Sequence, residues 1–304
     1  MDIQTASLAW LATLESKSSN TVRKYRTALD LFMQANKLTA DFDVSQIKRE
    51  HYNKFIRFLH AYAPASESLY IVGVTRFIEY LNFEHLCDLH PDEMKQMRRD
   101  RVRRPSPNLP QYPAKDLEKI IKVVSSTTGT LDELRDRALI ITLADTGLRV
   151  GEIVKLRRGD IDWDEGYTVI TGKGNKKAVV RFSIRSLRAM QEYLTARDER
   201  DQNKTKKTQT SQPIFSKINK MKQITDRTAR NIVYKAAKTA LGKNAHIWPH
   251  LFRHRFVTIA YKEKGLKMAQ ALARHARIET TNRYAHLSDE ELDRGYREIF
   301  DKNQ

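Results

Sequence analysis

Apolar residues return every three or four positions along the N-terminal third of the chain. A short run at 8–14 precedes three longer stripes at 22–32, 45–59 and 66–81. This spacing places the apolar side chains on one face of an α-helix and leaves the charged residues on the other face. Ser19 or Asn20 is suited to cap the first long stripe, because a short polar side chain accepts a hydrogen bond from the first helical turn. The pattern predicts a small all-helical domain at residues 1–94.

A basic stretch followed by prolines separates this domain from the rest of the chain. Six of the ten residues at 95–104 are Lys or Arg, and four of the eight prolines lie within 105–113. Prolines at this density cannot continue a helix and favour extended chain. We therefore expect an extended linker at residues 95–113, which serves either as a solvated tether or as a contact for a polyanion. A second domain then occupies residues 114–304.

The second domain combines helical stripes with a short β-rich region. Helical spacing recurs at 117–124, 134–143, 187–194 and 232–240. Two β-rich runs, Tyr167–Thr171 and Ala178–Phe182, flank the turn sequence GKGNKK, which predicts a hairpin with Lys173 at its tip. Residues 199–212 are almost wholly polar and are expected to form a surface loop. The fold class expected for the chain is mainly α, with a small β-hairpin or sheet in the second domain.

The net positive charge of the chain indicates a polyanionic partner. The 304 residues carry a formal net charge of +18, while 40% hydrophobic residues are enough for two folded cores. Nucleic acid is the simplest partner for such a chain. The chain contains no apolar run of membrane-spanning length and no N-terminal signal pattern, which argues against a membrane. The single cysteine, Cys87, allows no intrachain disulfide and fits a reducing cytosol. We expect a cytoplasmic, nucleoid-associated protein whose two domains clamp double-stranded DNA.

The candidate chemistry is concentrated between residues 250 and 286. His250 and Arg253 are three residues apart, so both point to one face of a helix. Arginine offers two oxygens of a phosphate a planar pair of donors, and an imidazole beside it adds a further donor or a base. His275 and, nine residues later, Tyr284 close the stretch. A tyrosine delivered to a bound phosphate can attack it as a covalent nucleophile.

Four spaced motifs resemble the tyrosine recombinase (integrase) family in a compact, Xer-like form. They are TGLRVGEI at 146–153, TGKGNK at 171–176, HLFRHRF at 250–256 and ARHARIETTNRYAH at 273–286. The segment SSNTVRKY at 18–25 also resembles the core-binding domain of that family. The resemblance implies a catalytic set of Arg149, Lys173, His250, Arg253, His275 and Tyr284. It implies a site-specific DNA recombinase that requires no cofactor and no metal ion.

The resemblance also implies a role for each residue. Tyr284 would attack the scissile phosphate, release a 5′-hydroxyl and leave a 3′-phosphotyrosine link, and Arg149 and Arg253 would neutralise the transition-state charge. Lys173 would be the general acid, His250 a candidate base, and His275 a hydrogen-bond donor to the phosphate. Taken alone, Arg149 could instead be a surface arginine paired with Glu152.

One position departs from the family pattern. The family usually places glycine before the second histidine, and this chain has Arg274 there. Glycine permits a tight turn, so the backbone before His275 is the affected feature. Arg274 is expected either to add a phosphate contact or to lie on the surface.

Partners follow from the resemblance as well. It implies a homotetramer on two DNA sites, with accessory proteins as further candidate partners. A tail helix would dock on a neighbouring subunit, or pack on its own domain, through the apolar residues Leu292, Tyr296, Ile299 and Phe300. Integration, transposition, dimer resolution and inversion all stay open as roles.

Three other functions are alternatives to this hypothesis. The chain could be a non-catalytic DNA-binding protein on the same fold, or have type IB topoisomerase-like activity. A metal-dependent nuclease would draw its carboxylates from Asp145, Glu152, Asp160 and Asp162. A zinc site at His250, His254 and His275 has no cysteine and no HExxH spacing to support it.

Overall fold

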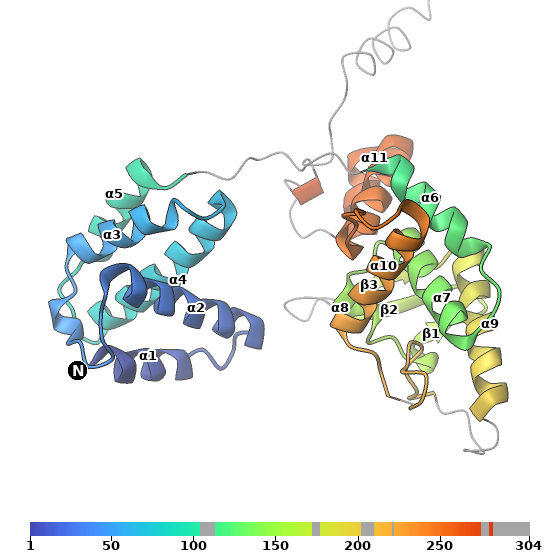
Figure 1. Cartoon of the computed structure of the whole chain (residues 1–304), viewed down its shortest axis with the longest axis horizontal. Helices are drawn as coiled ribbons and strands as arrows, with labels where there is room; N and C mark the ends of the chain where they lie inside the picture. Colours follow the sequence, from blue (N-terminus) through green and yellow to red (C-terminus); the bar gives the residue numbers. More distant parts are fainter. Residues whose placement is uncertain (104–112, 172–176, 202–209, 221, 275–279, 282–304) are drawn as a thin grey trace, which may run out of the picture. The chain divides into compact units, whose positions relative to one another are not determined.

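The computed structural model describes the chain except residues 104–112, 172–176, 202–209, 221, 275–279 and 282–304. It divides into two compact units, Met1–Pro107 and Asn108–Gln304, each with its own hydrophobic core (Figure 1). Among the described residues, no helix combines the length and the apolar character needed to cross a membrane.

The first unit is all-helical, as predicted. Its elements are α1 (Ile3–Ala12), α2 (Ser19–Asn36), the 3-10 turn η1 (Val44–Gln46), α3 (Arg49–Leu59), α4 (Pro64–Phe83) and α5 (Pro91–Arg101). The cap of α2 is Ser18, one residue before the predicted positions, and its side chain accepts from the Thr21 N–H. Gly73 lets α4 approach α2 closely, since a Cβ there would lie 2.9 Å from Cβ of Ala28.

The predicted extended linker is wrong in its first half. Helix α5 continues to Arg101 and buries Met94 and Met97 in the core of the first unit. Proline explains the outcome: Pro91 stands in the first turn of α5, where it is favoured, and the next proline follows only at position 105. The basic residues at 95–101 therefore lie on a helix, the same helix that buries Met94 and Met97.

Arg103 lies just after α5 and is also anchored to the first unit. Its Nε donates to Oε2 of Glu67 at 2.7 Å, and its backbone N–H donates to Oε1 of the same carboxylate at 3.2 Å. The Glu67 side chain is fully buried. A buried carboxylate needs such a partner, so the chain is fixed at least as far as Arg103.

The second unit consists of helices and a small sheet, which contributes Ile161 and Val180 to the core. Its elements are α6 (Ala114–Ser125), α7 (Leu131–Thr146), α8 (Val150–Ile153), η2 (Arg158–Asp160), β1 (Ile161–Asp162), β2 (Tyr167–Thr171), β3 (Lys177–Arg181), α9 (Ile184–Asp201), α10 (Asp226–Leu241) and α11 (Pro249–Ala273). The strands form an antiparallel sheet in the order β1-β2-β3, and Thr171 pairs with Lys177. The predicted hairpin is confirmed, and β1 adds a strand that the sequence pattern did not indicate.

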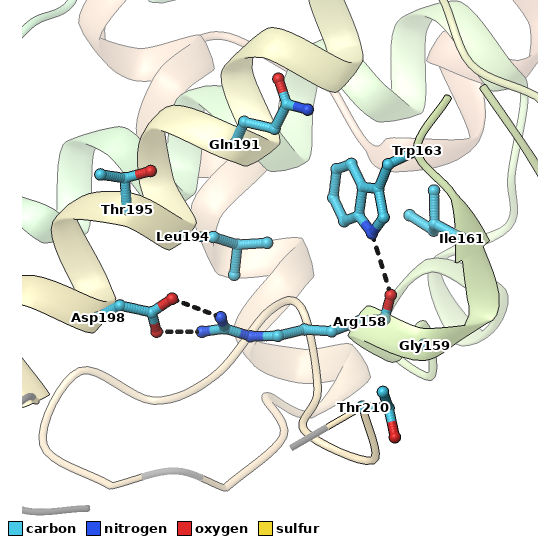
Figure 2. Close-up of a pocket in the computed structure, with 9 residues that line it drawn as sticks. All are labelled: Arg158, Gly159, Ile161, Trp163, Gln191, Leu194, Thr195, Asp198 and Thr210. Atoms are coloured by element: carbon cyan, nitrogen blue, oxygen red, sulfur yellow. Dashed lines mark hydrogen bonds and ion pairs between the residues drawn. The ribbon is translucent and has the colours of Figure 1, made fainter. Parts of the chain in front are cut away.

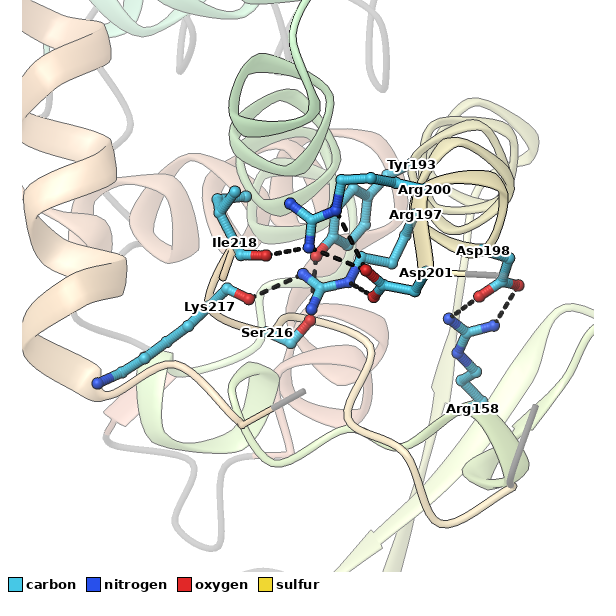
Figure 3. Close-up of polar contacts among 9 residues, drawn as sticks. All are labelled: Arg158, Tyr193, Arg197, Asp198, Arg200, Asp201, Ser216, Lys217 and Ile218. Atoms are coloured by element: carbon cyan, nitrogen blue, oxygen red, sulfur yellow. Dashed lines mark hydrogen bonds and ion pairs between the residues drawn. The ribbon is translucent and has the colours of Figure 1, made fainter. Parts of the chain in front are cut away.

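The predicted polar loop at 199–212 begins later than expected, because α9 runs to Asp201. Figure 3 shows the contacts that hold this end of the helix. Arg197, which is 1% exposed, donates from Nε to Oδ2 of Asp201 and from Nη1 to the Lys217 carbonyl, both at 2.8 Å. Arg200 also binds Asp201. These pairs satisfy the buried charge at the end of α9, which runs to Asp201, beyond the apolar stripe that ends at Leu194.

Helix α11 carries two of the six candidate catalytic residues, His250 and Arg253. Pro249 stands in its first turn, where proline is favoured. At Gly265 the backbone leaves the helical region (φ 75°, ψ −178°), so α11 consists of two helices joined at a bend. The second of these helices ends at Ala273, and Arg274 is its cap.

Candidate active site

The end of α7 determines where Arg149 lies. Gly147 caps α7 in the left-handed conformation, with φ 59° and ψ 21°. A Cβ at this position would stand 2.4 Å from Cδ1 of Phe256. Glycine is therefore required both by the backbone angle and by the close approach of α11. The tight turn brings Arg149 to the N-cap of α8 with half of its side chain exposed.

His250 and Arg253 lie in the first helix of α11, as the spacing predicted. Arg253 is 1% exposed, and its Nη1 donates to the Gly147 carbonyl at 2.6 Å. Its Nη2 donates to the Ala273 carbonyl at the far end of α11. This one guanidinium therefore connects three parts of the chain: the end of α7, the start of α11 and the end of α11. Because Arg253 holds two carbonyls, it has a structural role besides any role toward a ligand.

Arg149 and His250 line one pocket of about 390 Å³. Arg230 and the exposed rings of Tyr234 and Trp248 also line it. Three segments that are far apart in the sequence thus meet there, at the start of α8, on α10 and at the start of α11. The pocket combines two guanidinium groups and an imidazole with one carboxylate, Asp226, which lies 3.9 Å from Arg230. Positive groups outnumber the one negative group, which suits an anion.

The environment of His250 favours its neutral form. Packing of protein around the ring lowers the pKa of His250 below its usual 6.5, and the positive charges of Arg253 and Arg149 lower it further. The ring also packs edge-on against His254, with 4.8 Å between ring centroids. A neutral imidazole at pH 7 can accept a proton, so His250 has the protonation state of a general base.

Glu152 is the carboxylate that binds Arg149. It accepts from the Arg149 N–H at 2.9 Å and from Arg149 Nη1 at 2.8 Å, so the pairing suggested by the i, i+3 spacing is confirmed. Burial raises the pKa of Glu152, but the Arg149 N–H bond and the charges of Arg274 and Arg149 outweigh it, and the net shift is downward. Glu152 is therefore ionised at neutral pH and holds Arg149 in place.

Arg274 does not lie on the surface. Its side chain is 8% exposed, and Nη2 donates to Oε2 of Glu152 at 3.2 Å and to the Gly147 carbonyl at 3.4 Å. Its backbone is left-handed, with φ 57° and ψ 40°. The surface alternative for Arg274 is therefore wrong. The usual glycine at this position pointed to the backbone, which is indeed left-handed, and not to the buried side chain.

The other predicted residues have no structural test here. Lys173, His275 and Tyr284 lie outside the described residues, as does the tail at 292–300, so their roles stay predictions. The structure brings together Arg149, His250 and Arg253.

Each of the four carboxylates considered for a metal-dependent nuclease accepts hydrogen bonds from a different set of protein groups. Asp145 accepts from Ser183 and Arg185, and Glu152 binds the arginines named above. Asp160 accepts a hydrogen bond from the backbone N–H of Arg157. Asp162 accepts hydrogen bonds from the backbone N–H groups of Asp164 and Glu165. Within the described part of the chain, no three His, Cys, Asp or Glu side chains are placed to hold a metal ion.

A second pocket, of about 500 Å³, lies between η2, β1 and α9 (Figure 2). Arg158 and Asp198 form a two-bond ion pair there, at 2.6 and 2.7 Å, and Trp163 donates to the Arg158 carbonyl at 3.1 Å. It shares no lining residue with the pocket of Arg149 and His250. This part-buried ion pair links η2 to α9, which is a structural role.

Replacing Gly147 by alanine is expected to destabilise the second unit and to disturb the site. A left-handed alanine costs about 1–3 kcal/mol, and Phe256 must also move. Thermal unfolding of Gly147→Ala should therefore begin at a lower temperature than for the wild type. Gly166→Ala is the control, since Gly166 has a similar φ of 67° but its nearest neighbour is the side chain of Leu187 at 3.1 Å. Equal losses in the two variants would contradict the role of the close approach.

Comparisons with known proteins agree with this architecture. Residues 112–291 match the model of the phage integrase family. The chain is 28% identical over 299 residues to the tyrosine recombinase XerC of Pediococcus pentosaceus, covering 97% of this chain and 96% of the relative. It is also 28% identical to the XerC of Herpetosiphon aurantiacus, covering 93% of this chain and 90% of that protein.

Solved structures share the fold. The XerH recombinase bound to a palindromic difH substrate, in a post-cleavage complex, aligns with a TM-score of 0.69 at 18% identity. That alignment covers 92% of this chain and 80% of XerH. A lambda integrase dimer bound to a COC′ core site aligns with a TM-score of 0.68 at 16% identity, over 94% of this chain and 96% of that one. Since the family model spans more than half of its residues, the chain belongs to the phage integrase family and is an Xer-like tyrosine recombinase.

Proposed function

We propose that this chain cleaves and rejoins double-stranded DNA at specific sites through a covalent link to Tyr284. The observation that carries the proposal is the meeting of Arg149 and His250 in one pocket, beside the buried Arg253. These are the residue types that phosphoryl transfer without a metal ion requires. XerH and lambda integrase, whose folds this chain shares, are bound to DNA in their solved structures.

Charge balance defines the roles of the residues. As the Tyr284 oxygen attacks phosphorus, a phosphorus–oxygen bond forms and the bond to the 5′-oxygen breaks. Additional negative charge develops on the non-bridging oxygens, and Arg149 and Arg253 stabilise it. The bond energy of the phosphodiester is kept in the phosphotyrosine, so the reverse attack by a 5′-hydroxyl rejoins the strand without ATP.

Two proton transfers accompany this exchange. His250 is proposed to accept the Tyr284 proton, which fits the neutral ring that its lowered pKa indicates. Lys173 is proposed to protonate the departing 5′-oxygen, and His275 to donate a hydrogen bond to the phosphate.

The same proposal covers the assembly. The helical unit would act as the core-binding domain and the second unit as the catalytic domain, which together clamp the DNA. Four subunits on two DNA sites would then complete strand exchange in the cytoplasm, at the nucleoid. The net charge of +18 supports a long electrostatic contact with the phosphate backbone.

A covalent-trapping assay tests the proposal. The preferred DNA site is first selected from a random library, and a nicked copy is incubated with the protein in the presence of a chelator. A nick next to the cleavage position lets a short fragment diffuse away, so the covalent complex accumulates. An adduct that survives denaturant supports the proposal. Tight binding with no adduct would favour a non-catalytic DNA-binding protein.

The pH dependence of cleavage should follow His250. Because the pKa of His250 lies below 6.5, its neutral form persists at pH 7 and is lost as the pH falls through that lowered value. Single-turnover cleavage should therefore be level near neutrality and decline only below pH 6.5. Arg149→Ala removes a nearby positive charge and should move the decline to higher pH, whereas Arg149→Lys should leave it unchanged. A decline centred above pH 6.5 in the wild type would exclude His250 as the base.

A further inference from the structure

Arg274 occupies a backbone conformation that costs energy. Only three described residues other than glycine have positive φ, and Arg274 is one of them, at φ 57°. A left-handed residue with a side chain costs about 1–2 kcal/mol, a cost that glycine avoids. The family usually has glycine at this position. This chain therefore accepts a strained backbone and gains a guanidinium.

The guanidinium is incompletely bonded. The side chain is 8% exposed, and both of its bonds come from Nη2 and are long, at 3.2 and 3.4 Å. Within the described structure, Nε and Nη1 are covered and have no hydrogen-bond partner. A buried N–H without a partner costs about 1–3 kcal/mol. Because both bonds use Nη2, Nε and Nη1 can donate to a further acceptor while the pair with Glu152 is kept.

The location of Arg274 indicates what that acceptor would be. Arg274 shares the Gly147 carbonyl with Arg253, and it shares the Glu152 carboxylate with Arg149. Three guanidinium groups thus share one carboxylate and one carbonyl as acceptors. His250 lies near them, since the charges of Arg253 and Arg149 lower its pKa. The cluster has an excess of positive charge, which a small anion would balance.

We propose that Arg274 is a third phosphate-binding arginine, which donates from Nε or Nη1 to a non-bridging oxygen of the scissile phosphate. The inference rests on the proposed function and extends it to a residue type that the family does not usually have there. Arg274 would share the transition-state charge with Arg149 and Arg253, and Glu152 would hold two of the three guanidinium groups in position.

The test compares two substrates and two variants. One nicked site carries the normal scissile phosphate, and the other carries a methylphosphonate, which lacks one negative charge. Arg274→Gly removes the guanidinium and relieves the backbone, so its melting temperature should equal or exceed that of the wild type. We expect Arg274→Gly to form the adduct on the normal site roughly 10²–10³-fold more slowly, as for loss of one preorganised donor. Arg274→Lys, which keeps the charge but loses the paired donors, should fall in between.

The methylphosphonate separates a charge effect from a structural one. With one charge already absent, the difference between wild type and Arg274→Gly should shrink several-fold. An unchanged difference on the two substrates, or a wild-type rate for Arg274→Gly on the normal site, would overturn the role of Arg274 and leave the proposed function intact. A wild type that forms no adduct on either substrate would instead overturn the proposed function, and the role of Arg274 with it.

Discussion

Tyr284→Phe is expected to abolish covalent attachment to DNA while binding stays close to the wild-type level. The substitution removes a single oxygen, the one that would bond to phosphorus, and leaves the aromatic ring in place. Binding rests mainly on backbone contacts from a chain with a net charge of +18, so the loss of one hydroxyl should change affinity little. Gel analysis after denaturation, together with a binding titration, measures both effects.

The structure offers a matched control for this experiment. Tyr234 is an exposed tyrosine in the same pocket as Arg149 and His250, and is therefore the described residue that could replace Tyr284 as nucleophile. Tyr234→Phe should form the adduct at nearly the wild-type rate. If the adduct were lost in Tyr234→Phe and kept in Tyr284→Phe, the nucleophile would be Tyr234.

Arg149→Ala should slow cleavage by roughly 10²–10³-fold, the usual effect of removing one preorganised donor from a transition state. Arg149 is a better choice than Arg253 for this test. Arg253 is buried and holds two carbonyls, so its removal would also damage the fold. Arg149 is half exposed, and its only described partner is Glu152. Glu152, whose side chain is 17% exposed, keeps Arg274 as a partner when Arg149 is removed, so the melting temperature should fall only slightly.

Arg76→Ala is the control for Arg149→Ala. Arg76 also forms an i, i+3 pair with a glutamate, Glu79, at the same 2.8 Å, and it is 63% exposed. Its removal deletes an equivalent charge and an equivalent ion pair from the first unit. With protein in excess over DNA, the single-turnover cleavage rate of Arg76→Ala should match that of the wild type. A comparable loss in both variants would mean that Arg149 acts through overall charge.

Apolar spacing predicted α1 to α4, α6, α7, α9 and α10 but not their ends, and it missed α5. The ends depend on single residues whose effect is local: Pro91 begins α5, Gly147 ends α7, and the Arg197–Asp201 pair carries α9 past its apolar stripe. The two-residue strand β1 exists because Ile161 and Asp162 pair with β2. No periodic pattern can indicate so short a strand.

The candidate site was predicted in part, because motif order indicates which residues meet but not how each is held. Arg253 illustrates this, since its contacts to Gly147 and Ala273 involve backbone carbonyls, which a sequence does not mark. The i, i+3 spacing did indicate the pairing of Arg149 with Glu152. For Arg274, neither of the two expected roles included its contact with Glu152, because that contact joins residues that are far apart in the chain.

The nucleophile is identified directly by finding the amino acid that carries the DNA in the covalent adduct. The wild-type adduct is digested with trypsin and a nuclease, and the nucleotide-bearing peptide is sequenced by mass spectrometry. Cleavage after Arg283 and Arg294 should yield the peptide YAHLSDEELDR, with a 3′-linked nucleotide on its first residue, Tyr284, while the released strand carries a 5′-hydroxyl. A nucleotide on the peptide NIVYK, which contains Tyr234, or a 5′-phosphate link to any residue, would contradict the account.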